Sequence, residues 1–321
     1  MRDLTRNRER YKRMKQSARF RSLNLCMLST CTLISVTYLF GCEQTPHRSA
    51  DQGQTDAEIE RDDATSLLPN QTCSGYFGQP NEQSGLSEEV CNTSCACEEG
   101  QHSWSQPLTT SPLFNLRQSD PPSPLEVDPY LEPESATDSP TLNEEACVIL
   151  IDSSAETYRL ETRPLREADP ALVTHLGPCG ACSSLHDLKV YLERTDLTEP
   201  VRSCGLQSIS RGQEEGVRCL RELGFSEPCA TIWYFNTLNT RSRCLEVCLA
   251  HLRSPYVDEE GALNPCLACD EEESGPIFKR YAGRTRRNSG ITSAICRPCD
   301  TVSSVSHVYL ESTAAPLTSP E

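Results

Sequence analysis

The sequence predicts a disulfide-rich, mainly α-helical small domain with a minor β element, preceded by disordered linkers. Three observations lead to this fold class: 19 of the 321 residues are cysteine, two long stretches are polar, and most apolar residues of the second half recur at helical spacing. In an oxidising compartment such cysteines pair, and each disulfide typically adds about 2–4 kcal/mol of stability. We therefore expect cross-links to contribute much of the folding energy.

The first 41 residues have the composition of an export signal. Nine of the first 22 are Lys or Arg, and the next 18, from Leu23 to Phe40, carry no charge. This run leads into "LFGC" at 39–42, which resembles the lipobox of bacterial lipoprotein precursors. An uncleaved membrane anchor is the alternative, because 18 uncharged residues are close to the shortest stretch that spans a bilayer.

The lipobox resemblance implies that residues 1–41 are a signal peptide and that Cys42 carries lipid, palmitate included. It implies a protein of the bacterial cell envelope, attached to the membrane through this lipid anchor. Glu43 stands where Asp retains many such proteins in the inner membrane, so the outer membrane is favoured. We expect the partner to be another molecule of the envelope or of the extracellular space.

The charge of the chain is strongly negative. The full chain has 30 basic and 46 acidic residues, a net charge of −16. Without residues 1–41 it has 21 basic and 44 acidic residues, a net charge of −23. Such a surface repels phosphate backbones, so nucleic acid is not expected as a partner.

Composition divides the exported chain into five parts. The stretches on either side of the first cysteine cluster contain too few apolar residues to offset the entropy cost of ordering. The expected parts are a flexible acidic tether (42–72), a small cysteine-rich segment (73–97), a Pro/Ser/Thr-rich linker (98–145), a cysteine-rich, mainly helical domain (146–310) and a disordered tail (311–321).

Two short strands are predicted at the start of the main domain. "ACVILI" (146–151) is rich in β-branched residues, and "TYRLET" (157–162) alternates apolar with charged side chains. Both patterns are typical of strands that are at least half buried.

Three helices are predicted after these strands. Ser184 and Asp187 form a capping box before the apolar residues of 184–194. A second helix is expected over 211–224, with Ser210 as its cap and a glycine at its end. A third is expected to start near Ser226 and to be interrupted in its Asn/Thr-rich middle.

The cysteines of the exported part form a candidate disulfide framework. Cys26 and Cys31 lie in the signal segment and Cys42 is the lipid-attachment residue, which leaves an even number. Order along the chain does not fix the pairing, since eight cysteines already allow 105 connectivities. Cys244 and Cys248 share a helix face, and each is expected to reach a different element. The disulfide candidates are Cys73, Cys91, Cys95, Cys97, Cys147, Cys179, Cys182, Cys204, Cys219, Cys229, Cys244, Cys248, Cys266, Cys269, Cys296 and Cys299.

Four stretches together resemble an uncharacterised family of cysteine-rich exported proteins, over about Ala146 to His307. They are "GPCGACSSLHDLKVY", "DLTEPVRSCG", "CATIWYFNTLNTRSRC" and "AGRTRRNSGITSAICRPC". The resemblance implies no activity, so it assigns no catalytic residue.

A redox centre is one alternative to the structural disulfides. Cys179 and Cys182 form a Cys-x-x-Cys pair just before the predicted helix of 184–194. A helix N-terminus stabilises a thiolate, so Cys179 would be the nucleophile and Cys182 the resolving thiol of a thiol-disulfide oxidoreductase. No βαβ pattern surrounds the pair, and this favours structural disulfides.

A zinc-stabilised module is the other alternative. Cys266, Cys269, Cys296 and Cys299 form C-x2-C-x26-C-x2-C, and two such pairs can complete a tetrahedral zinc site. His175 with Cys179 and Cys182 would be a second donor set. The spacing of 26 residues exceeds the usual 15–20, and exported thiols oxidise early.

One basic run stands out in this acidic chain. Forked guanidinium contacts could bind a phosphate or an acidic glycan. The alternative is that the run neutralises the acidic residues 270–273 nearby. The residues of the run are Lys279, Arg280, Arg284, Arg286 and Arg287.

These patterns favour a non-enzymatic, lipid-anchored envelope protein that presents a disulfide-stapled domain for binding or structural work. No cofactor is indicated unless zinc occupies the last two cysteine pairs.

Overall fold

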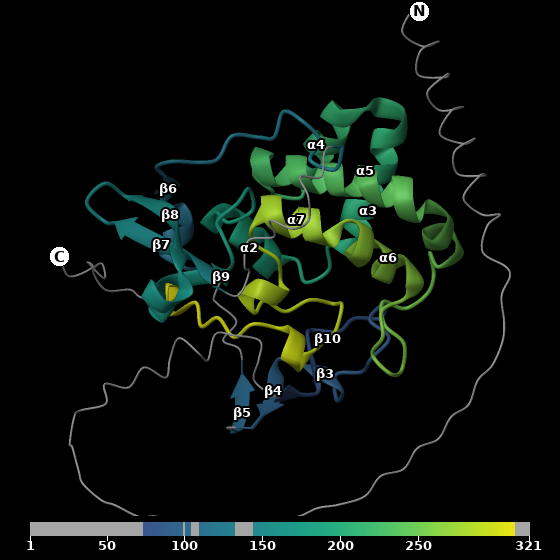
Figure 1. Cartoon of the computed structure of the whole chain (residues 1–321), viewed down its shortest axis with the longest axis horizontal. Helices are drawn as coiled ribbons and strands as arrows, with labels where there is room; N and C mark the ends of the chain where they lie inside the picture. Colours follow the sequence, from purple (N-terminus) through teal and green to yellow (C-terminus); the bar gives the residue numbers. More distant parts are fainter. Residues whose placement is uncertain (1–72, 99, 104–108, 132–143, 312–321) are drawn as a thin grey trace, which may run out of the picture. The chain divides into compact units, whose positions relative to one another are not determined.

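The computed structural model describes residues 73–98, 100–103, 109–131 and 144–311 (Figure 1). The predicted signal peptide with Cys42, the tether and nearly all of the predicted tail lie outside these residues. In the part that is described, no helix is both long and apolar enough to cross a membrane.

The described residues form six α-helices and three small sheets, so the protein is mixed α/β. The prediction of a disulfide-rich fold is confirmed, and the prediction of a mainly helical one is wrong. Several strands are only two residues long and pair with distant segments. Such strands are too short to show an alternating pattern in the sequence.

A four-stranded sheet contains both predicted strands. They form an antiparallel hairpin of β7 (Glu145–Asp152) and β8 (Thr157–Pro164), whose turn is held by the Asp152 carboxylate accepting the N–H of Ser154 at 3.0 Å. The sheet order is β6-β8-β7-β9, with β6 at Arg117–Gln118 and β9 at Val173–Leu176.

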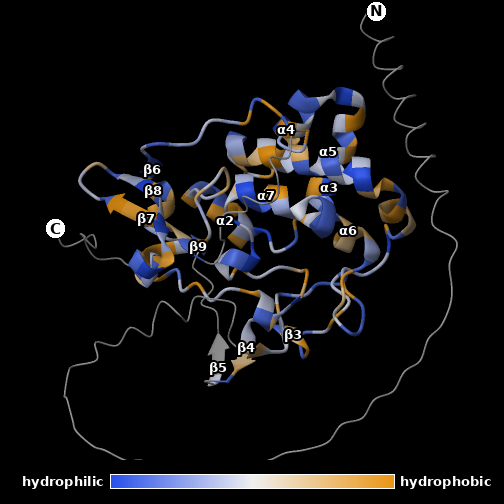
Figure 2. Cartoon of the chain, in the orientation of Figure 1, coloured by the Kyte–Doolittle hydropathy of each residue, from blue (hydrophilic) through white to orange (hydrophobic). Residues whose placement is uncertain are grey.

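Strand β7 is buried on both faces. Ile149 belongs to the main core with α2, α4, α5 and α7, whereas Val148 packs in a second core against β9. In Figure 2, β7 is strongly hydrophobic, while hydrophobic and hydrophilic residues alternate along the helices. Apolar residues of α2, α4, α5 and α7 pack into the main core, while Leu206 on α3 and Leu249 on α5 stay exposed.

The helices are α2 (Leu185–Glu193), α3 (Thr198–Arg211), α4 (Gln213–Glu222), α5 (Glu227–Ala250), α6 (Pro265–Glu273) and α7 (Gly275–Ala282). The predicted cap of α2 is confirmed: the Ser184 hydroxyl accepts the N–H of Asp187 at 2.9 Å. Ser210 is not a cap, because it lies inside α3, and Gly212 at φ 86° separates α3 from α4.

The expected interruption of α5 is wrong, since the helix is continuous over 24 residues. Its polar side chains find hydrogen-bond partners on the helix itself or on a neighbouring element. The hydroxyl of Thr231 donates to the Glu227 carbonyl at 2.8 Å, and Asn239 donates to the Glu273 carbonyl at 2.9 Å. Partners on α5 itself and on α6 therefore compensate for the weak helix propensity of this stretch.

Two further sheets lie in the first cysteine-rich segment. One has the order β1-β4-β5, with strands Cys73–Ser74, Ser94–Cys97 and Gly100–Ser103. The other has the order β10-β2-β3, with strands Arg297–Pro298, Tyr76–Phe77 and Cys91–Asn92. Strand β10 comes from the far end of the chain, so it joins this segment to the C-terminal part.

All sixteen predicted cysteines form disulfides. Cys91–Cys296 and Cys95–Cys299 each close a loop of about 200 residues and tie the first cysteine-rich segment to the end of the chain. Cys244 and Cys248 both bond to α6, so the expectation that each reaches a different element is wrong. The remaining pairs are Cys73–Cys97, Cys147–Cys179, Cys182–Cys229, Cys204–Cys219, Cys244–Cys269 and Cys248–Cys266.

Candidate ligand-binding groove

The Cys-x-x-Cys pair before α2 is divided between two disulfides. Cys179 bonds to Cys147 on β7, and Cys182 bonds to Cys229 in the first turn of α5. A redox couple between Cys179 and Cys182 would require both of these bridges to break. The structure therefore places the pair as two anchors of the loop that precedes α2.

The zinc alternative is not supported. Cys266, Cys269, Cys296 and Cys299 each have a different disulfide partner, whereas a zinc site needs free thiolates. Throughout the described residues, no group of three or more His, Cys, Asp or Glu side chains is placed to hold a metal ion.

His175, the other candidate ligand, is engaged at both ring nitrogens. Nδ1 donates to the Leu176 carbonyl at 3.0 Å, and Nε2 accepts from the Ser183 hydroxyl at 2.7 Å. The side chain is fully buried, and this burial lowers the pKa of the imidazole well below its ordinary value. His175 is thus a neutral core residue.

The basic run is split between the interior and the surface. Arg284 is fully buried and donates to three backbone carbonyls, those of Cys182 at 3.2 Å, Thr174 at 2.9 Å and Ser183 at 2.9 Å. These contacts hold the loop before α2 against β9. A side chain enclosed in this way is not accessible to a ligand.

Arg286 also binds the chain itself. Its guanidinium donates to the carbonyls of Tyr191 at 2.8 Å, Thr292 and Arg194, and lies 5.3 Å from the centre of the Tyr191 ring. Burial lowers the pKa of Arg286 to about 10. Arg286 therefore fastens the C-terminal segment to the end of α2.

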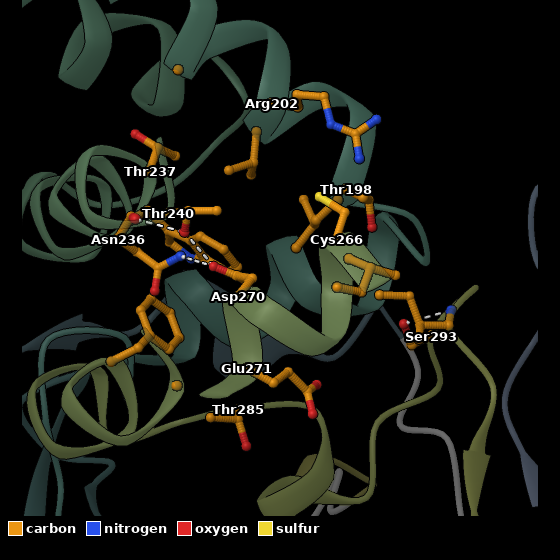
Figure 3. Close-up of a pocket in the computed structure, with 18 of the residues that line it drawn as sticks. Thr198, Arg202, Asn236, Thr237, Thr240, Cys266, Asp270, Glu271, Thr285 and Ser293 are labelled. Carbon is orange, nitrogen blue, oxygen red and sulfur yellow. Dashed lines mark hydrogen bonds between the residues drawn. The ribbon is translucent and has the colours of Figure 1, made fainter. Parts of the chain in front are cut away.

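A groove of about 410 Å³ lies between α3, α5 and α6 (Figure 3). One wall is a stripe of α3 residues spaced three or four apart, as expected for one helix face. The opposite wall is the corresponding face of α5, which includes Asn236, Thr237 and Thr240. The α3 stripe consists of Thr198, Val201, Arg202, Gly205, Leu206 and Ile209.

Helix α6 forms the third wall and is fixed in two ways. Asn264 caps its N-terminus by accepting the N–H of Leu267 at 3.0 Å, and Pro265 occupies the first turn. The disulfides of Cys266 and Cys269 then attach it to the C-terminal half of α5. This double attachment keeps the two walls at a fixed separation.

Part of the groove lining is apolar and exposed. The structure describes nine large hydrophobic side chains as exposed, and five of them line this groove. Concentrated apolar exposure of this kind marks an interaction site more often than scattered single residues do. The five are Leu206, Ile209, Leu245, Leu249 and Leu252, with exposures between 48% and 58%.

A polar network lies along the middle of the groove. Asn236 donates to the Asp270 carboxylate at 3.2 Å, and the Thr240 hydroxyl contacts the same carboxylate (Figure 3). The Tyr130 hydroxyl donates to the Asn236 side-chain oxygen at 3.0 Å, or to the Ser274 carbonyl at 3.1 Å. Burial raises the pKa of Asp270. The network orients the groove-facing side of α6 against α5.

The groove lining around Glu271 is cationic, and this part is called the cationic end. Arg287 lies 3.6 Å from the Glu271 carboxylate, which also pairs with Arg297. Lys279 lines the same end, and burial together with the Arg287 charge lowers its pKa. Its ammonium has no ion pair or side-chain hydrogen bond among the residues the structure describes. Three cations thus surround one carboxylate.

The sequence patterns identified some of these cations but missed the groove itself. Lys279 and Arg287 belong to the predicted basic run, whereas Arg297 lies outside it. The apolar wall depends on α3, which was not predicted. Leu206 and Ile209, three apart, were the available signal.

Fold and groove together define a disulfide-rich mixed α/β protein with a partly apolar groove, of a kind made in an oxidising environment. Residues 213–305 match the model of a family of unknown function (DUF8771). The match covers α4 to α7 and the cationic end of the groove, and it begins after α3. No curated protein and no solved structure matches the chain.

Proposed function

We propose that this protein is a lipid-anchored binding protein of the bacterial cell envelope and that the groove between α3, α5 and α6 is its binding site. The observation that carries the proposal is the groove itself, which is lined by five exposed apolar side chains and whose α6 wall is fixed to α5 by two disulfides. Rigid apolar clefts with a few polar groups are the usual form of ligand sites.

Export and anchoring are supported by two independent features. Eight disulfides require an oxidising compartment, which in bacteria is the envelope or the exterior. The "LFGC" of 39–42, placed after a basic and then an apolar stretch, supplies the anchor residue Cys42. The outer membrane is proposed because Glu43 replaces the Asp that retains such proteins in the inner membrane.

The anchor is tested by labelling growing cells with a palmitate analogue and isolating the protein. The wild-type protein and a Cys31→Ala control are expected to carry label, and Cys42→Ala is expected to carry none. Label that persists in Cys42→Ala, or is absent from the wild type, would contradict lipid attachment at Cys42. Separation of the two membranes then tests the outer-membrane assignment.

The binding site is tested with Nile red, a neutral dye that fluoresces in apolar sites. Leu249→Ser, at 58% exposure in the groove, is expected to weaken dye binding at least about threefold. Leu131→Ser is the matched control, because Leu131 is 74% exposed and lies outside the groove. Equal dye binding by both variants would contradict the proposed site.

A further inference from the structure

We infer that the groove binds a long-chain fatty acid, with the acyl chain against the leucine-rich walls of α3 and α5 and the carboxylate at Lys279, Arg287 and Arg297. This inference rests on the proposed binding function and specifies its ligand. Four features of the groove support it: its exposed apolar residues, its cationic residues around Glu271, its size, and the chemistry of its polar residues.

The exposed apolar residues offer the contact that an acyl chain requires. Leu206 and Ile209 on α3 face the same groove as Leu245 and Leu249 on α5, and each is about half exposed. An acyl chain between them removes water from both partners. Each methylene buried in this way improves the affinity about fourfold.

The cationic end offers the contact that a carboxylate requires. Arg287 and Arg297 share the single carboxylate of Glu271, and Lys279 adds a third positive charge without an ion pair among the described residues. The cluster therefore has excess positive charge in a chain whose net charge is −16. Half-buried cations bind carboxylates through charge-assisted hydrogen bonds.

The polar network of the groove does not compete with the ligand carboxylate for the cations. Asn236 and Thr240 on α5 hold the Asp270 carboxylate, which is thereby bonded to the groove wall. Burial raises the pKa of Asp270, whose carboxylate is engaged by Asn236 and Thr240.

The size of the groove is that of a small-ligand site. Its volume of about 410 Å³ lies within the ~300–1,000 Å³ that is usual for such sites, and a single acyl chain is a ligand of this class.

The test uses three amphiphiles with the same twelve-carbon chain and different heads: dodecanoate, dodecyltrimethylammonium and dodecyl maltoside. Each is titrated calorimetrically into the oxidised protein below its critical micelle concentration. Dodecanoate is expected to bind at least about tenfold more tightly than the cationic and neutral compounds. Equal affinity for all three heads, or a preference for the cation, would overturn the inference.

Matched variants locate the carboxylate head of the ligand. Lys279→Gln is expected to weaken dodecanoate binding about tenfold, and Lys189→Gln, an exposed lysine on α2 outside the groove, is expected to leave it unchanged. Arg287→Gln is a second head variant, with Arg243→Gln as its control. If neither head variant binds more weakly than its control, the carboxylate is not held at this end and the inference fails.

Failure of the ligand assignment is distinguishable from failure of the proposed function. If dodecanoate does not bind while Leu249→Ser still reduces Nile red binding and Cys42 still carries lipid, the fatty acid is wrong and the binding function stands. A concentration-dependent dimer that Leu249→Ser dissociates would assign the groove to a second copy of the chain and would also overturn the fatty-acid inference.

Discussion

Replacing Arg284 with methionine is expected to destabilise the protein by about 3–5 kcal/mol. The guanidinium is fully buried, and its Nε, Nη1 and Nη2 atoms donate to the carbonyls of Cys182, Thr174 and Ser183 at 3.2, 2.9 and 2.9 Å. Methionine is also unbranched and fills much of the same space, so the change removes hydrogen bonds while leaving only a small cavity.

The magnitude follows from two opposing contributions. Each hydrogen bond to a charged group contributes about 1.5–3 kcal/mol, so three lost bonds destabilise the folded state by several kcal/mol. The folded mutant no longer has to bury a cation, which returns part of that energy. Since the three carbonyls remain buried without this donor, the loss of hydrogen bonds is the larger contribution.

The assay is urea unfolding of the oxidised protein at pH 7, followed by circular dichroism. Arg243→Met is the control, because the Arg243 side chain is 62% exposed and its carboxylate partner, Glu273, lies 3.9 Å away. The control is expected to change the free energy of unfolding by less than about 0.5 kcal/mol. A similarly small effect for Arg284→Met would refute the argument that this side chain is a structural clamp.

Three further predictions concern burial, backbone conformation and oxidation. Burial lowers the pKa of His307 to about 3, so its contribution to stability is complete above the unfolded pKa of about 6.5 and is lost as the pH falls towards 3. Urea unfolding is expected to show about 2 kcal/mol less stability from this residue at pH 5 than at pH 7, and His307→Gln is expected to lack that part of the loss. Gly283→Ala should destabilise strongly, because Gly283 has φ +73° and a Cβ there would lie 2.5 Å from a backbone nitrogen; Gly275→Ala, with open space around it, should not. Peptide mapping without reduction should find Cys179 and Cys182 in separate disulfides, and a bridge between them would contradict the structure.

Local patterns predicted the elements whose signals are contained within a few residues. The β-branched run of 146–151 forms most of β7, and Ser184 caps α2 as the capping-box pattern indicates. In both cases the stabilising partners lie nearby in the sequence or are supplied by any apolar core.

The continuity of α5 could not be predicted, because it depends on partners that are distant in the sequence. Its Asn and Thr residues lower helix propensity, and the partners of Asn236 and Asn239 lie on α6 and at Ser274 after it, more than 30 residues away. The disulfide pairing could not be predicted for the same reason. Cys91 and Cys296 are 205 residues apart, and their proximity depends on the whole fold.

The sequence indicated part of the candidate site through its run of positive charge. Charge alone did not show which residues of the run line the groove and which are buried in the interior. Arg284 and Arg287 are three residues apart, yet one is enclosed by backbone carbonyls and the other reaches Glu271 at the groove. Exposure decides between a structural and a binding role here, and exposure depends on how the loop before α2 packs against residues 283–287.

The arrangement of the disulfides explains how an apolar groove can stay open in water. Apolar walls of this kind would gain free energy by closing on each other, because closure removes their surface from water. Cys244–Cys269 and Cys248–Cys266 attach α6 to α5 at two points one turn apart, and Cys204–Cys219 attaches α3 to α4, so the helices that line the groove have little freedom to slide or rotate into the space. A site that is already open loses less conformational entropy when a ligand binds. Reduction of the two bridges between α5 and α6 should therefore weaken ligand binding before it unfolds the main core, whose α2–α5 contact is held by the separate Cys182–Cys229 bridge.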